Sequence, residues 1–160
     1  MQRVTTIDAE LARRGAEDGE RAAELHRQIA GRLGTDPDAL DQWETHLEHC
    51  ADVDMAMDTV ADLTDVAPTS TAEILADDDA ARRLVRLLGV SSELGHHLVA
   101  HPDDLSQLTA EPTRMPARQI EADLCAEVGA RPDDSGFLVA GPDFVAGADR
   151  LRLANQRHLV

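Results

Sequence analysis

The chain has 160 residues, 42% of them apolar but only 2% aromatic, so we expect one domain with a core of Leu, Val, Ala and Met. Its net charge of −16 argues against binding to nucleic acids or anionic membranes, because both need a basic surface. All 15 basic residues are Arg, and the absence of Lys and Tyr excludes a P-loop lysine, a Schiff-base lysine and a catalytic tyrosine.

The cysteines and the N-terminus indicate an intracellular protein. Cys50 and Cys125 are too few and too far apart in sequence for a disulfide framework, which favours a reducing compartment. The N-terminal sequence MQRVTTIDAE lacks the basic and apolar regions of a signal peptide, and no apolar run approaches the roughly 20 residues of a membrane span. We therefore expect a cytoplasmic protein.

Helical patterns begin near the N-terminus. Thr6 is the expected N-cap of a helix over residues 7–14 that ends near Gly15. A second helix is expected over residues 17–33, ending at Gly34.

The sequence TDPDALDQW indicates a new helix start. Asp36 is the expected N-cap and Pro37 the first helical residue. Leu40, Trp43 and Leu47 follow at helical spacing, so we expect them to face the core.

Residues 52–66 place apolar side chains on one stripe and predict a helix that Pro68 ends. The stripe consists of Val53, Ala56, Val60 and Leu63.

Residues 77–88 predict a helix with acids in its first turn, where the helix dipole favours negative charge. Asp78 with Arg82, and Asp79 with Arg83, have the i,i+4 spacing of ion pairs. The expected buried face consists of Ala81, Leu84, Val85 and Leu88.

The stretch LLGVSSELGHHLVAHP contains three histidines, two serines and two glycines. Ser91 is the expected N-cap of a helix over residues 92–100, which His101 closes, and Pro102 starts a further turn.

Within that helix we expect Leu94 and Leu98 to be core residues that continue a stripe from Val90. Gly95 would let another helix approach closely, and His97 is expected on the helix flank. Replacement by Ala is therefore expected to be most damaging at Leu98, less so at the capping serine, and least at His97.

The C-terminal part predicts two more helices. The first covers residues 116–129, and the last begins near Pro142 and continues to the end of the chain, which suggests a fragment truncated within that helix. The sequence FLVA between them is expected to form at most an isolated strand. We expect an all-α, bundle-like segment over residues 1–160, with residues 1–35 as a loosely attached arm.

Two groups of residues have the spacing of metal ligands. His46, His49 and Cys50 lie at i, i+3 and i+4, and His97 and His101 lie at i and i+4. A closed zinc site needs a fourth ligand, and the chain has neither a CxxC pair nor an HExxH motif. Polar helix faces are the favoured interpretation, and a metal site at the first group is the alternative.

Asp52 and Asp54 form a DxD, the pattern that chelates two metals in polymerase-like enzymes. That geometry needs a strand, whereas on a helix the two side chains diverge by roughly 200°. Ser91 and Ser92 lack the GxSxG elbow of a nucleophile. We therefore assign no catalytic, cofactor-binding or metal residue.

The segment LLGVSSELGHHLVAHPDDLSQL resembles the N-terminal region of actinobacterial bifunctional glutamine synthetase adenylyltransferases, which add AMP to glutamine synthetase and remove it. The segments ADVDMAMDTVADLTD and ADRLRLANQRHLV are similar to further parts of that region, so the resemblance covers residues 40–160. The family pattern LGxSxxLxxxLxxHP is matched by Leu88, Gly89, Ser91, Leu94, Leu98, His101 and Pro102.

The resemblance implies a segment that packs against a following nucleotidyltransferase domain, whose Gly-Ser and DxD motifs would lie beyond Val160. It implies ATP and magnesium as cofactors of the parent enzyme and glutamine synthetase as its target in nitrogen regulation. Asp52 and Asp54 do not match the family's DxD, so the segment alone is expected to be inactive. The alternative function is a free-standing acidic helical module that binds a protein partner.

Overall fold

The computed structural model describes residues 6–110, 115–132, 138–139 and 144–159. These residues form an all-α protein, which confirms the predicted fold class, with one pair of two-residue strands in addition. Contacts group the chain into two compact units, residues 1–110 (unit 1) and residues 111–160 (unit 2). The single segment with a loosely attached arm stays a prediction. No described helix has the length and apolar character needed to cross a membrane.

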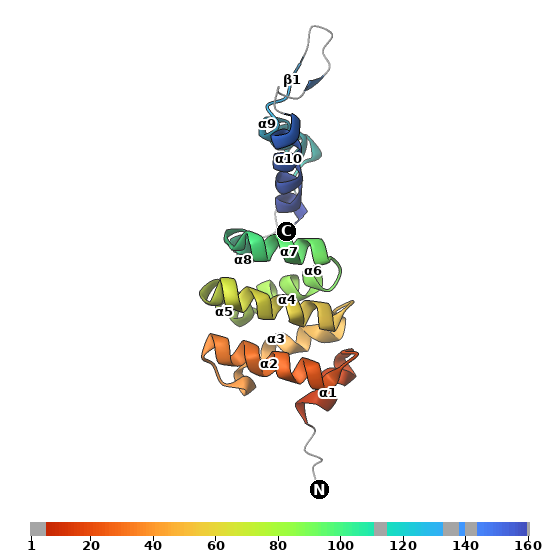
Figure 1. The fold of residues 1–160 in the computed structure, drawn as a ribbon, viewed down its shortest axis with the longest axis vertical. Coiled ribbons are helices and arrows are strands. Elements are labelled where there is room, and N and C mark those ends of the chain that lie inside the picture. Colours follow the sequence, from red (N-terminus) through yellow and green to blue (C-terminus); the bar gives the residue numbers. More distant parts are fainter. Residues whose placement is uncertain (1–5, 111–114, 133–137, 140–143, 160) are drawn as a thin grey trace. The chain divides into compact units, whose positions relative to one another are not determined.

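Unit 1 consists of short helices, of which α4 is central. α4 packs against α2 and against α7, and Figure 1 shows these three helices in successive layers. The elements are α1 (Ile7–Arg14), α2 (Gly19–Leu33), the 3₁₀ helix η1 (Pro37–Leu40), α3 (Asp41–Glu44), the 3₁₀ helix η2 (Thr45–His49), α4 (Val53–Val66), α5 (Pro68–Ala76), α6 (Asp78–Leu88), α7 (Ser92–Ala100), the 3₁₀ helix η3 (Pro102–Leu105) and α8 (Ser106–Thr109).

Side-chain caps fix the starts of the longer helices in unit 1. Asp18, Asp52, Asp77 and Ser91 each accept a hydrogen bond from the backbone amide three residues on, at 3.0, 2.8, 2.8 and 3.2 Å. Each bond satisfies a donor that the first helical turn leaves without a partner. The predicted cap at Ser91 is confirmed.

Glycines in the left-handed region end the first two helices, as predicted. Gly15 has a φ of 113° and Gly34 a φ of 63°, values that a residue with a Cβ rarely adopts.

The core of unit 1 is mainly aliphatic, and the apolar stripes predicted for residues 40–47, for α4 and for α6 face it. The indole ring of Trp43 is 1% exposed and lies in this core. The confirmed stripe residues are Leu40, Trp43, Leu47, Val53, Ala56, Val60, Leu63, Ala81, Leu84, Val85 and Leu88.

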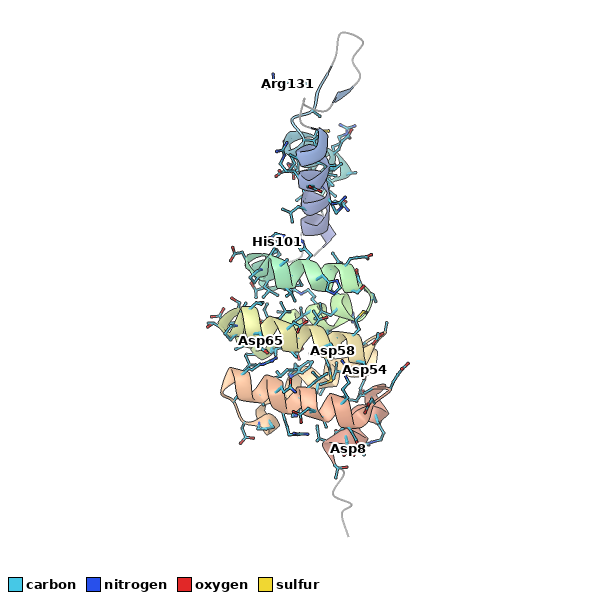
Figure 2. All side chains as sticks on the ribbon, viewed as in Figure 1. Asp8, Asp54, Asp58, Asp65, His101 and Arg131 are labelled. Carbon is cyan, nitrogen blue, oxygen red and sulfur yellow. The ribbon has the colours of Figure 1, made fainter. Side chains whose placement is uncertain are left out.

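Ion pairs join α2 to α4 at the edge of this core. Arg21 contacts Asp58 at 2.7 Å and Arg32 contacts Asp65 at 2.8 Å. Figure 2 shows both aspartates on α4, facing α2. Exposed pairs of this kind add little stability, so burial of the apolar stripes is the main force that holds the two helices together.

Two local features of unit 1 differ from the sequence expectations. The helix predicted over residues 52–66 is confirmed as α4, which ends at Val66, but Pro68 then begins α5, for which no helix was predicted. Proline is well tolerated at a first helical position because the missing amide has no helical partner there.

The charged pairs predicted for α6 also have different partners. Asp79 pairs with Arg82 at i,i+3, while Asp78 contacts His46. Arg83 donates from Nε to the backbone oxygen of Asp79 at 3.2 Å. Spacing along the helix alone does not determine these pairs. They also depend on how far each side chain extends and on η2, which lies beside the start of α6.

Unit 2 contains α9 (Ala117–Glu127), β1 (Arg131–Pro132), β2 (Leu138–Val139) and α10 (Phe144–Leu159). α9 packs against α10, and Arg150 donates to the backbone oxygen of Glu127 at 3.0 Å. The strand expected in FLVA is present at Leu138–Val139 but is not isolated, because it pairs antiparallel with β1. Phe137, Ala140 and Pro142 lie outside the described residues.

Candidate functional site

The stretch that resembles a family motif forms the junction of α6, α7 and η3. Leu88 and Leu98 are fully buried, which confirms Leu98 as a core residue. Leu94 is only half-buried, and Val90 is 70% exposed, so the expectation that they form a continuous buried stripe is wrong. A turn separates the two helices at Val90 and rotates it out of the stripe.

Gly89 follows the last residue of α6, and the space at this position admits only a glycine. Its φ is −75°, so the left-handed conformation of a glycine cap is absent. A Cβ at this position would overlap with Sγ of Cys50 and would lie 3.2 Å from the backbone nitrogen of Ala51. The glycine therefore permits close contact between the end of α6 and the segment that precedes α4.

Cys50 is held in that contact. Its Sγ donates to the backbone oxygens of Asp52 at 3.2 Å and Val85 at 3.5 Å. Burial raises the pKa of the Cys50 thiol, because the thiolate is less well solvated there. A raised pKa makes this cysteine a poor nucleophile.

Gly95 has the role that its sequence position predicted. It is buried, and a Cβ there would lie 3.1 Å from Cγ2 of Thr59 on α4. The absence of a side chain lets α7 approach α4 closely.

His97 is buried rather than on the helix flank, so that expectation is wrong. It is 4% exposed, and its Nε2 lies 2.8 Å from Oδ2 of Asp104 in η3. The ring of His101 lies 4.9 Å from that of His97, and His101 ends α7 and precedes η3 as predicted. His97 and His101 therefore lie where α7 meets η3, and His97 joins the two helices through Asp104.

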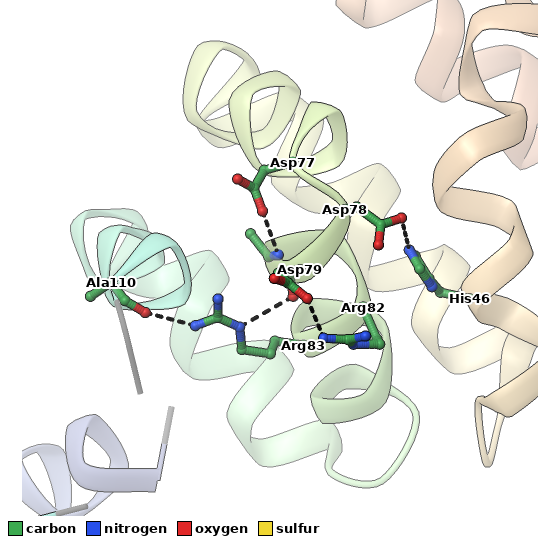
Figure 3. Close-up of polar contacts among 8 residues, drawn as sticks. His46, Asp77, Asp78, Asp79, Arg82, Arg83 and Ala110 are labelled. Atoms are coloured by element: carbon green, nitrogen blue, oxygen red, sulfur yellow. Dashed lines mark hydrogen bonds and ion pairs between the residues drawn. The ribbon is translucent and has the colours of Figure 1, made fainter. Parts of the chain in front are cut away.

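The start of α6 forms a second group of polar contacts (Figure 3). His46 Nε2 lies 3.1 Å from Oδ1 of Asp78. Arg83 donates to the backbone oxygen of Ala110 at 2.7 Å, which fastens the last residue of unit 1 to α6. These contacts link α6 to η2 and to the end of α8.

The three candidate metal ligands, His46, His49 and Cys50, have different surroundings. His46 contacts α6, His49 is exposed, and Cys50 is half-buried against Gly89. Within the part of the chain that the structure describes, no three His, Cys, Asp or Glu side chains are grouped closely enough to hold a metal ion.

Asp52 and Asp54 line a groove of about 380 Å³ between α4 and α7. Asp52 caps α4, and Asp54 accepts a hydrogen bond from the backbone amide of Glu17 at 2.7 Å. The groove is lined by Glu17, Asp52, Asp54, Met55, Asp58, Thr59, Asp62, Ser92, His96 and Val99. One oxygen of each DxD carboxylate is thus bonded to a backbone amide.

Unit 1 also contains a buried cluster of Arg14, His26 and Glu44 that was not predicted from the sequence. Glu44 is 1% exposed, and its two oxygens lie 2.7 Å from Nη1 of Arg14 and 2.7 Å from Nε2 of His26. This cluster joins α1, α2 and α3. The available signal was that His26 shares the buried stripe of α2 with Ala22 and Ile29.

Comparison with known proteins finds relatives that align with the whole chain or nearly all of it. It matches no family model and no solved structure. It is 45% identical over 160 residues to the "Bifunctional glutamine synthetase adenylyltransferase/adenylyl-removing enzyme" of Cutibacterium acnes. It is 28% identical over 156 residues to the protein of the same name in Bifidobacterium longum subsp. infantis.

The chain spans 16% and 14% of the lengths of these two relatives. All of its own residues are covered by the first of them. The resemblance seen in residues 88–102 is confirmed: along its whole length the chain is homologous to the N-terminal region of actinobacterial bifunctional glutamine synthetase adenylyltransferases.

Proposed function

We propose that this chain is the helical segment of a larger enzyme that adenylylates and deadenylylates glutamine synthetase, and that it positions the catalytic part of that enzyme. The proposal rests on the 45% identity of the whole chain to the adenylyltransferase of Cutibacterium acnes, and the chain spans 16% of the length of that relative. A segment so much shorter than the relative is expected to contribute one part of the machinery.

The polar side chains of unit 1 support a structural role. Asp52, Asp77 and Ser91 cap helices, and the pairs formed by Asp104 and Glu44 join neighbouring helices. Adenylyl transfer needs groups that hold the metal ions and stabilise charge on the transferred phosphoryl group. We assign ATP and magnesium, which the resemblance implies, to the parent enzyme outside this chain.

An activity assay tests the proposal directly. The parent enzyme is expected to transfer labelled AMP to glutamine synthetase, whereas residues 1–160 alone are expected to transfer none. A parent enzyme from which residues 1–160 have been deleted should lose activity and regain it when the purified segment is added. Transfer by the segment alone would refute the positioning role.

Reading the DNA beyond the codon for Val160 separates this proposal from its rival. An in-frame continuation with Gly-Ser and DxD motifs is expected. A stop codon there would favour the free-standing acidic module instead.

A further inference from the structure

We draw no further inference here: the strongest candidate, the acidic groove between α4 and α7 that Asp54, Asp58, Asp62 and His96 help to line, is a cluster of carboxylates at which no second feature of the described residues points to a ligand.

Discussion

Units 1 and 2 have similar helical patterns but very different burial. The apolar stripe of α4 is fully enclosed by α2, α5, α6 and α7, whereas α9 has its main contact with α10 and buries no residue. Both helices show the spacing that predicts an amphipathic helix. The periodicity of apolar residues therefore predicts that a helix forms, whereas the number of neighbouring elements that pack on the helix determines how much of its surface is buried.

The units also differ in buried charge. Unit 1 holds Glu44 beneath its surface between Arg14 and His26, while the described residues of unit 2 include no buried ionisable side chain. Removing one member of a buried pair leaves the other charges without compensation, which is more costly than losing an exposed pair.

The largest expected effect is therefore at Glu44. Glu44→Ala should lower the free energy of unfolding by about 3–5 kcal/mol, because His26 would stay buried without its partner and Arg14 would keep only the partly exposed Glu10. Urea unfolding followed by circular dichroism measures the change. Asp58→Ala, which removes the exposed partner of Arg21 between α2 and α4, is the control and should have a far smaller effect. Equal losses would mean that the buried cluster contributes no more than a surface pair.

Replacing one leucine in each unit tests the difference in burial between the units. Leu98→Ala should cost about 2–5 kcal/mol because the leucine is fully buried between packed helices. Leu124→Ala on α9 removes the same atoms from a half-buried site and should cost less than about 1 kcal/mol in residues 1–160. Urea melts of both variants are the measurement. A Leu124 variant as damaged as the Leu98 variant would show that unit 2 has a core of its own.

Local signals in the sequence were sufficient for most helices of unit 1. Ser91 as a cap and the stripe from Val53 to Leu63 depend on residues within one or two turns, so a single sequence carries them. The pairing of His97 with Asp104 spans a change of helix, and that of Glu44 with Arg14 spans 30 residues. Neither can be deduced without knowing which helices meet.

The corrected position of His97 changes the expected order of effects at the α7 junction. His97→Ala should cost about 1–3 kcal/mol, because it leaves the Asp104 carboxylate without its buried partner. Ser91→Ala should cost about 1 kcal/mol through the lost N-cap. The order in urea melts is therefore Leu98, His97 and then Ser91, where the sequence alone placed His97 last. A His97 variant as stable as the wild type would restore the flank interpretation.

The smallest effect concerns the two cysteines, one in each unit. Burial raises the pKa of Cys50, so less thiolate forms at neutral pH and alkylation should be slow. The raised pKa also predicts a pH effect on stability. The contribution of Cys50 is present below the pKa of the unfolded thiol, about 8.5, and is lost as the pH rises through the folded value.

Single-thiol variants turn this difference into a measurement of how each unit opens. With Cys125→Ser, iodoacetamide reports on Cys50 beneath Gly89, and with Cys50→Ser it reports on Cys125 on α9. We expect Cys50 to react more slowly, because burial raises the pKa of its thiol and because α6 and α4 must separate to expose it. In concentrated urea the alkylation rates of Cys50 and Cys125 should converge, because both units are then unfolded. Equal rates without urea would mean that α9 opens as rarely as the centre of unit 1, which its lack of buried residues argues against.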